Sequence, residues 1–327
     1  MRPTAATWRM VAGGKLAVRA TSPTSHVVVK KGAEHEEVRL DVDESLVHRV
    51  TRRGETATAT ILHGSATFHV PPRFCSVDVA TCGGDVHVEA VVEADLHVDS
   101  RGGEVHVGQA RGMRAHVRSD GGNVSLGELA AHVDVWTGRG HVQARKVLGP
   151  QVQIATVEGH VDVGAIYGET VRITSETGDV KVSQLSAEDG VVETGRGTVD
   201  VRGVQGCLHV STHGKPIRLY LHDQARFVRA TSQGGSITCM VPRGIQAKVI
   251  MQGNNRTISP TLNFASLNEE HDVLTGVLGD ARRPEESTTV NTIELYAGEG
   301  KIELEESSWM EQILGRQAWS AINASPA

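Results

Sequence analysis

One short pattern recurs along most of this chain and restricts its fold more than any other feature of the sequence. The pattern is Gly-x-Val-x-Val, and successive copies lie 18 to 20 residues apart. A unit of this length cannot hold a strand, a helix and two turns, but it fits one coil of a parallel β-solenoid. The first apolar residue of each copy is Val86, Val105, Val124, Val142, Val161, Val180, Val199, Ile217 and Ile237.

A second apolar segment precedes the glycine of every unit, and a hydroxyl residue follows two positions after its last apolar anchor. Side chains alternate between the two faces of a strand, so these hydroxyls are predicted to point inward at a corner. There they can hydrogen-bond to one another and to the turn backbone. The alternative is an outward row that binds ice or a ligand, which requires a flat outer face. The hydroxyl residues are Thr81, Ser100, Ser119, Thr137, Thr156, Ser175, Thr194, Thr212 and Ser232.

The glycine of the pattern is predicted to mark either a turn with positive φ or a corner too tight for a Cβ atom. In the unit of Ile217 this place is taken by Lys215. The turn glycines are Gly84, Gly103, Gly122, Gly140, Gly159, Gly178, Gly197 and Gly235.

These periods predict an all-β fold, a single-stranded parallel β-solenoid with coils of about 19 residues. The solenoid is expected over residues 64–306, after an N-terminal β cap at 34–63. Ile302 follows Ile237 by 65 residues, which equals one coil plus an insertion at about 242–288, whose polar part is expected to be an exposed loop. Residues 307–327 are expected to form a capping helix and tail, because Ser308 and Glu311 make a capping box before an apolar face.

The first 33 residues contain arginine, lysine, serine and threonine but no aspartate or glutamate. Such a segment resembles a mitochondrial transit peptide, and its alternative is an ordinary basic N-terminus in a cytoplasmic protein. The four cysteines form no CxxC pair, which favours a reducing compartment. No apolar run approaches 18 residues, so no transmembrane helix is expected. A net charge of −6 argues against a nucleic-acid partner.

Histidines stand at equivalent positions in neighbouring units, so each pair is expected to lie one strand spacing apart on the outer surface. Two imidazoles could share zinc or another borderline metal, but further ligands would have to come from nearby carboxylates. The alternatives are solvated surface histidines or a pH-sensitive surface charge. The candidate pairs are His87 with His106, His97 with His116, and His141 with His160.

No catalytic motif accompanies these residues. GxSxG, HExxH and GxxxxGK[ST] are absent, and the outward acids Asp162 and Asp200 are separated by a unit that carries Lys181. Coils of nearly constant length offer no insertion to shape a cleft. The chain is therefore predicted to be no enzyme and to need no cofactor.

Several units resemble the adhesin-like short-coil β-solenoid domain of unknown function. The resemblance rests on Gly-Asp-Val-Lys-Val at 178–182, on similar runs at 156–163 and 232–238, and on Val241-Pro242. Gly-Glu-Gly-Lys-Ile at 298–302, followed by a tryptophan, resembles the eukaryotic branch called family with sequence similarity 185. The resemblance covers about 64–306 and implies this fold, with no established activity and no functional residues to transfer.

These observations predict a non-enzymatic scaffold or a protein- or ligand-binding module with one or more protein partners. The alternatives are a solenoid that self-assembles end to end and a glycan-acting β-helix enzyme. The oligomeric state is left open by the sequence.

Overall fold

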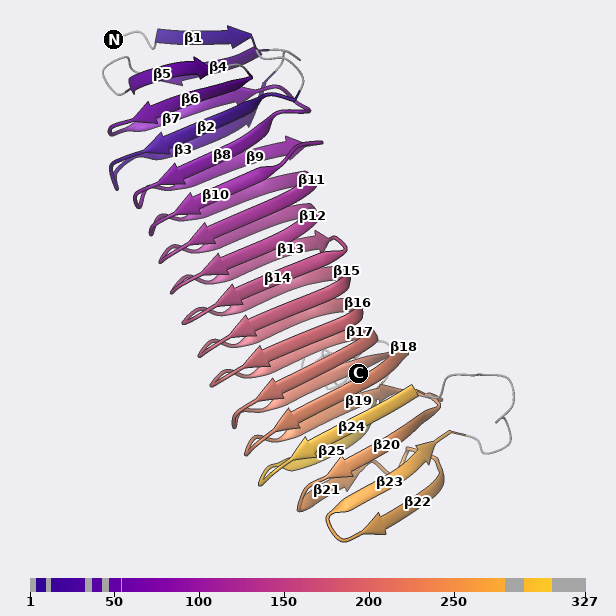
Figure 1. Cartoon of the computed structure of the whole chain (residues 1–327). Coiled ribbons are helices and arrows are strands. Elements are labelled where there is room, and N and C mark those ends of the chain that lie inside the picture. Colours follow the sequence, from indigo (N-terminus) through magenta and orange to yellow (C-terminus); the bar gives the residue numbers. More distant parts are fainter. Residues whose placement is uncertain are drawn as a thin grey trace, which may run out of the picture. The chain divides into compact units, whose positions relative to one another are not determined.

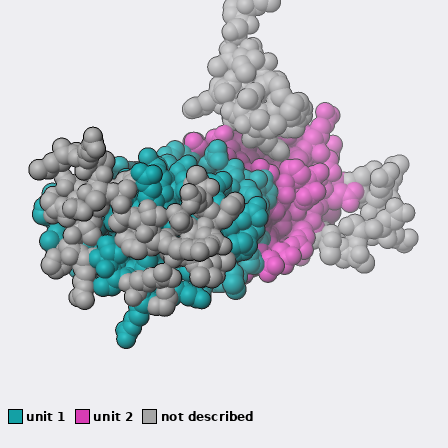
Figure 2. Space-filling view, turned by 90° about the horizontal axis from the view of Figure 1, so that it is seen from above, with its two compact units in different colours: residues 1–168 teal, residues 169–327 magenta. Residues whose placement is uncertain are grey.

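The computed structural model describes residues 4–9, 13–32, 37–42, 47–53, 55–279 and 291–307. Every regular element in these ranges is a β-strand, so the predicted all-β class is confirmed for them. Contacts divide the chain into two compact units, residues 1–168 and 169–327, which Figure 2 colours separately. Of the segment 307–327, predicted to be a capping helix and tail, Ser307 is the last residue of a β-strand and residues 308–327 lie outside the described residues.

Each coil has two strand segments joined by the turn that carries the glycine. We name the strand before this turn segment A and the strand after it segment B, and we call the turn the glycine corner. The connection from segment B to segment A of the next coil is the variable corner. In the coil of β8 (Ser76–Thr81) and β9 (Val86–Val92), β8 is segment A and β9 is segment B.

Long strands run through the variable corner and contribute to two coils. In β11 (Val105–Ser119), Val105–Arg111 is segment B of one coil and Arg114–Ser119 is segment A of the next. Unit 1 also contains β1 (Thr4–Arg9), β2 (Lys15–Ala20), β3 (His26–Lys31), β4 (Glu37–Val42), β5 (Val47–Arg53), β6 (Thr56–Ile61), β7 (Ser65–Val70), β10 (Leu96–Ser100), β12 (Val124–Thr137), β13 (Val142–Leu148), β14 (Gln151–Thr156) and the first part of β15 (Val161–Ser175).

The core of unit 1 is built from equivalent apolar residues that pair in parallel register. Val105 pairs with Val86 on one side and Val124 on the other, and each is at most 1% exposed. Residues at alternate positions face outward, as the burial pattern BeB at the start of β9 and β11 shows. β-Branched side chains suit this pleated, half-buried surface.

The N-terminal strands form a regular coil, and the coil begins well before the predicted boundary at residue 64. Strand β2 pairs in parallel with β6 and β8, while β3 pairs in parallel with β7 and β9. Residues 15–31 therefore lie between coils formed by residues 56–70 and 76–92 (Figure 1). This coil carries Leu16, Val18, Val27 and Val29 in the inward positions, which explains why it packs as well as the repeats.

Unit 2 continues the same coil design from Val171 within β15. Strands β16 and β17 pair in parallel, as do β17 and β18. The strands of unit 2 are the second part of β15, then β16 (Val180–Thr194), β17 (Val199–Thr212), β18 (Ile217–Ser232), β19 (Ile237–Pro242), β20 (Ala247–Gln252), β21 (Asn255–Ile258), β22 (Phe264–Glu270), β23 (Val273–Leu278), β24 (Asn291–Ala297) and β25 (Lys301–Ser307).

The last coil of the chain also lies between two others. Ile302 of β25 pairs with Ile237 of β19, as the 65-residue spacing predicts. On their other side, β24 and β25 pair in parallel with β20 and β21 (Figure 1). The insertion thus supplies a further coil, and residues 264–278 form the antiparallel strands β22 and β23 where the sequence suggested a loop.

Both units end in strands that depart from the parallel pattern. In unit 1, β5 pairs antiparallel with β6, and β4 pairs antiparallel with β7 and β1. In unit 2, β23 pairs antiparallel with β20 and β22. The inward column of unit 2 ends at Arg256, which pairs with Ile302 and forms an ion pair with Glu269 at 2.5 Å. A charged side chain in the core position ends the apolar stack, a device that limits edge-to-edge association.

The described part of the chain contains no helix that could span a lipid bilayer.

Candidate functional site

The structure places all nine predicted hydroxyl residues at buried positions in the glycine corner. Thr137 shows the bonding pattern. Its Oγ1 accepts a hydrogen bond from Gly140 N at 3.2 Å and donates one to the Gly122 carbonyl oxygen of the preceding coil at 3.3 Å. In unit 2, Thr194 bonds in the same way to Gly197 and Gly178. The hydroxyl therefore closes its own turn and also joins two coils, and it is not available to an external ligand.

The glycine column stands at these corners because there is no space for a side chain. None of the predicted turn glycines has positive φ, whereas the preceding Gly83 and Gly102 do. A Cβ atom on Gly140 would lie 1.9 Å from the Gly122 carbonyl oxygen, and one on Gly197 would lie 1.9 Å from that of Gly178. Of the two explanations offered by the sequence, the crowded corner is the one that the structure supports.

The three histidine pairs stack on the outer surface of unit 1. Ring centroids are 4.7 Å apart for His87 and His106, 4.8 Å for His97 and His116, and 5.0 Å for His141 and His160. Burial and the neighbouring imidazole lower the pKa values of His87 and His97. Among the described residues, no group of three or more His, Cys, Asp or Glu side chains is arranged to hold a metal ion.

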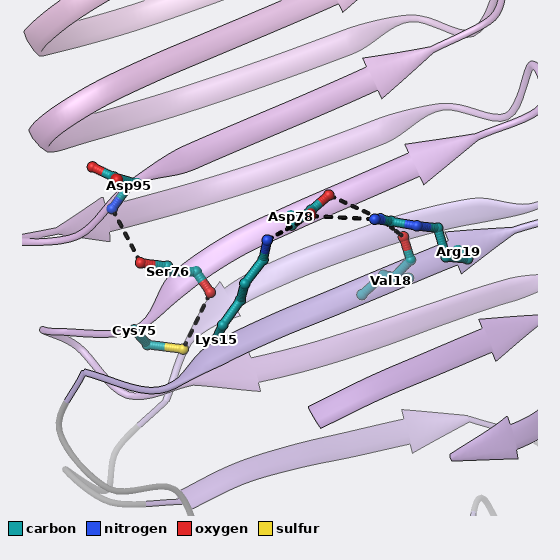
Figure 3. Close-up of polar contacts among 7 residues, drawn as sticks. All are labelled: Lys15, Val18, Arg19, Cys75, Ser76, Asp78 and Asp95. Atoms are coloured by element: carbon teal, nitrogen blue, oxygen red, sulfur yellow. Dashed lines mark hydrogen bonds and ion pairs between the residues drawn. The ribbon is translucent and has the colours of Figure 1, made fainter. Parts of the chain in front are cut away.

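A buried carboxylate connects the intercalated N-terminal coil to the repeats. Asp78 is 7% exposed and accepts hydrogen bonds or ion pairs from Lys15 Nζ at 2.7 Å and Arg19 at 2.8 Å (Figure 3). Burial alone would raise the pKa of Asp78, but the bonds from Arg19 and Lys15 outweigh it and bring the pKa to about 2. Beside it, Ser76 Oγ accepts from the backbone N of Asp95 at 3.4 Å. This cluster fastens strands together and leaves no free charge for a ligand.

Two adjoining cavities open at the variable corner of unit 1. The first, of about 420 Å³, is mainly apolar, with Met113, Leu148 and Pro150 in its lining. The second, of about 230 Å³, is lined mostly by residues with polar side chains, and for this reason we call it the polar cavity; both cavities include His132. The polar cavity is lined by Arg114, Ala115, His116, His132, Val133, Asp134, Gln151 and Gln153. We call the two cavities together the corner hollow.

The corner hollow arises where one coil is a residue short. Val133 follows Val124 by nine residues, whereas Ala115 follows Val105 by ten, and the pairing register shifts between Arg111 and Arg114. The glycine corner cannot absorb this change because its turn is hydrogen-bonded and crowded. The expectation that coils of nearly constant length shape no cleft is therefore wrong here, since a shortened coil produces the hollow.

The outer side of segment A beside the hollow carries an aromatic ring among paired charges. His116 Nδ1 lies 3.0 Å from Asp134 Oδ2, and the Arg118 guanidinium lies 4.6 Å from the Trp136 ring centroid. The next position in the same column is Ala155, which pairs with Trp136. We call this surface, from Asp95 to Ala155, face A.

Unit 2 has a larger cavity of about 700 Å³ among the turns 242–246 and 261–265. Its lining includes two charged residues, Arg243 and Glu306, and these form an ion pair at 3.7 Å. The chain leaves the described range beside it, at Gly279 and Ser307, so we place no site there.

The arrangement offers binding groups rather than catalytic ones. The lining of the polar cavity contains no serine, threonine or cysteine that the His116–Asp134 pair could activate. Burial raises the pKa of Cys239 to about 12 and that of Cys75 to about 11, which keeps both thiols protonated near neutral pH. Of the outward acids singled out in the sequence, Asp200 is paired with Arg202 at 3.1 Å.

In a comparison with protein-family models, the coils in the second half of the chain match one family. Residues 145–305 match the Toastrack DUF4097 family. The Toastrack match begins in β13 and ends in β25, so it includes the coils of unit 2 and their glycine corners. Most residues of the corner hollow lie N-terminal to the match.

Other comparisons give only distant similarities. A "putative adhesin" of Bacteroides fragilis is 13% identical, with 94% of this chain and 100% of that chain covered and a TM-score of 0.29. A "putative cell adhesion protein" of Clostridium sporogenes is 8% identical, with the same coverage and a TM-score of 0.18. TM-scores of this size do not establish a shared fold. No curated protein matches the chain.

Sequence reasoning did not find the corner hollow, although the sequence contains its signal. Val142 follows Val124 by 18 residues, while the preceding and following steps are 19. The same 18-residue step recurs from Val199 to Ile217, so the step length by itself does not single out residues 112–114 and 130–132.

Proposed function

We propose that this chain is a non-enzymatic binding module that holds its ligand on face A and the corner hollow of unit 1. The observation that carries the proposal is the joining of an apolar and a polar cavity at the exposed side chain of His132. Binding sites in proteins commonly combine an apolar wall with a few convergent polar groups. Met113 is 75% exposed beside this hollow, which is unusual for a large apolar side chain.

The remainder of the molecule supports a scaffold role. The hydroxyl residues form hydrogen bonds within the glycine corners, and the turn glycines allow the close packing of these corners. Asp78 forms ion pairs that join two coils. The unpaired polar side chains of the hollow are different, because His132, Gln151 and Gln153 form no hydrogen bond or ion pair among the described residues. A rigid sheet that presents unpaired planar groups needs little reorganisation to bind a partner.

The test uses a paired set of variants in the full chain. His132→Ala with Asp134→Ala removes the side chain that both cavities share and one further side chain of the polar cavity. Gln143→Ala with Asp162→Ala changes exposed residues of segment B in unit 1. Molecules that co-purify with the wild type from its own cells are identified by mass spectrometry and rebound in purified form. We expect the first pair to weaken binding at least about tenfold and the second to leave it unchanged.

A partner that binds all three proteins equally would place the binding surface elsewhere and overturn the proposal. Equal melting temperatures of the three proteins are the control for folding.

Two finer assignments are also proposals. We propose that the chain belongs to the eukaryotic branch named above, supported by Gly298-Glu299-Gly300-Lys301-Ile302 in the last coil. We also propose mitochondrial import, supported by the acid-free N-terminus. Because β2 starts at Lys15, a removable segment that leaves the fold intact ends before that residue, which N-terminal sequencing of the cellular protein would test.

A further inference from the structure

We infer that face A binds a neutral oligosaccharide, with one sugar ring stacked on the free side of the Trp136 indole. The inference rests on the proposed binding surface and names the class of ligand that this surface takes. Trp136 stands on β12, two residues after Asp134 and on the same side of the strand.

The Trp136 ring has one covered side and one open side. The Arg118 guanidinium, one coil earlier, lies over the ring at 4.6 Å from its centroid. One coil later the paired residue is Ala155, whose methyl group is too small to cover an indole. An aromatic ring held in place by a cation on one side presents a rigid apolar platform on the other. The C–H side of a pyranose ring is a flat apolar surface that fits such a platform.

The cations of face A are each beside a carboxylate, while Asp99, next to Arg118 in the same column, makes no ion pair among the described residues. Arg114 lies 3.6 Å from Asp95, Arg118 lies 3.5 Å from Asp120, and His116 lies 3.0 Å from Asp134. No lysine occurs among the residues of the hollow, and neither Arg114 of the hollow nor Arg118 of face A is left without a carboxylate. A phosphate or an acidic polymer would therefore find no unpaired cation, so the charge arrangement disfavours an anionic ligand, and the lysine-rich peptide in the experiment below tests a cationic one.

Neutral planar groups remain for hydrogen bonding. The Gln151 and Gln153 amides and the His132 imidazole line the 230 Å³ cavity and are exposed. Each amide offers a carbonyl acceptor and an NH₂ donor side by side, which matches the paired donor and acceptor roles of neighbouring sugar hydroxyls. Asp134 Oδ1 adds an acceptor, because the bond between Asp134 and His116 uses Oδ2. Asp134 lies two residues before Trp136 on β12, and Gln153 on β14 pairs with Asp134 one coil later.

In the experiment, the full-length protein is titrated with neutral xylo-, cello-, manno- and malto-oligosaccharides. Binding is measured by isothermal titration calorimetry and by tryptophan fluorescence. A sialylated oligosaccharide and a lysine-rich peptide serve as charged probes. We expect binding of at least one neutral oligosaccharide with a change in the fluorescence of Trp136. Trp136→Ala should weaken this binding about tenfold or more, and Trp136→Phe should retain part of it.

Ala155→Arg is the decisive variant, because it covers the open side of the ring and leaves Trp136 in place. It should weaken binding about as much as Trp136→Ala. Tyr167→Ala is the matched control, since Tyr167 is an aromatic residue of segment B with Lys146 5.9 Å from its ring, and it should leave binding unchanged. Thermal melting shows that each variant is folded.

The outcomes separate this inference from the proposed function. Binding of only the peptide or the sialylated probe, or binding unaffected by Ala155→Arg, overturns the glycan inference. Absence of binding to every sugar, together with a co-purified partner that depends on His132 and Asp134, overturns the inference and supports the proposed function. Absence of both overturns both.

Discussion

A Cβ atom added to Gly122 would lie 2.0 Å from the carbonyl oxygen of Gly103, which occupies the same corner one coil earlier. The adjacent Gly121 has much more space, because its nearest neighbour would be Gly102 Cα at 3.7 Å. Of these two neighbouring glycines in one turn, Gly122 has no space for a Cβ atom and Gly121 has enough. The stacking of coils therefore requires glycine only at position 122.

Gly122→Ala is expected to destabilise the protein by about 1–3 kcal/mol or more, because backbone atoms of two coils must separate. Gly121→Ala should leave stability unchanged or raise it slightly, since alanine reduces the entropy of the unfolded chain. Urea unfolding of both variants measures the difference. Equal stability of the two variants would show that the corner relaxes without cost.

Thr137→Val is expected to cost about 1–3 kcal/mol, because it leaves the buried Gly140 N–H without an acceptor while preserving the shape of the side chain. Thr137→Ser keeps the hydroxyl and should be closer to the wild type. Hydrogen exchange of the Gly140 amide gives the local measurement. Unchanged protection in the valine variant would argue against a structural role for the ladder.

Asp78 makes the stability of unit 1 sensitive to acid. Its pKa of about 2 in the folded protein lies below the ordinary value of 3.8, so its stabilising contribution is complete above about pH 4 and is lost as the pH falls towards 2. Asp78→Asn should cost about 1–2 kcal/mol at neutral pH, since its partners Lys15 and Arg19 are half exposed. The difference in melting temperature from the wild type should shrink between pH 4 and pH 2.

The stacked histidines predict a linked titration. His106 contributes to lowering the pKa of His87, after burial, so His106→Asn should raise the pKa of His87. In the wild type the pKa of His87 is lower in the folded protein than in the unfolded chain. As the pH falls below about 6.5, the unfolded chain therefore binds protons before the folded protein does, and the free energy of unfolding decreases. NMR titration of His87 measures the shift. His132→Asn is the control, and an equal shift in both variants would contradict direct coupling.

Because residues 15–31 form a coil between two others, we expect the protein to tolerate removal of the residues before this coil but not removal of the coil itself. Removal of residues 1–33 takes away β2 and β3 and exposes the edges of β6 and β8, so the product should aggregate or unfold. Removal of residues 1–12 takes away only β1 of the described strands, and the product should remain folded. Circular dichroism and size-exclusion chromatography compare the two. A monodisperse, fully folded fragment 34–327 would show that the intercalated coil is dispensable.

The coil and its register could be predicted because they follow from local rules. Alternation of valine with polar residues sets which side chains face inward, and the 65-residue step from Ile237 to Ile302 locates the last coil. The intercalation of residues 15–31 could not be predicted in this way. Its corner has Ser25 in the glycine position, and Val27 follows Leu16 by eleven residues where the repeats have nine. The two coils that it pairs with both come later in the sequence, at 56–70 and 76–92. The order of the coils in space therefore differs from their order in the sequence, and no periodic pattern indicates it.

The candidate site was only partly accessible to sequence reasoning for a related reason. Stacking of His97 on His116 follows directly from a 19-residue step. The environment of Trp136 depends instead on three coils at once, because Arg118 covers one side of the ring and Ala155 leaves the other open. A surface built across coils becomes apparent only when the columns are aligned with the correct, unequal steps.

The intercalated coils also determine the order in which a growing chain can complete its fold. Residues 15–31 are synthesised before either of their neighbouring coils, 56–70 and 76–92. At the other end, β24 and β25 are made last, yet they must enter between β18–β19 and β20–β21, which already exist. A chain interrupted before residue 291 therefore lacks the layer that joins two finished parts of unit 2. Synthesis of the final strands completes this unit, and a prematurely terminated product is left with open strand edges that quality-control factors can recognise.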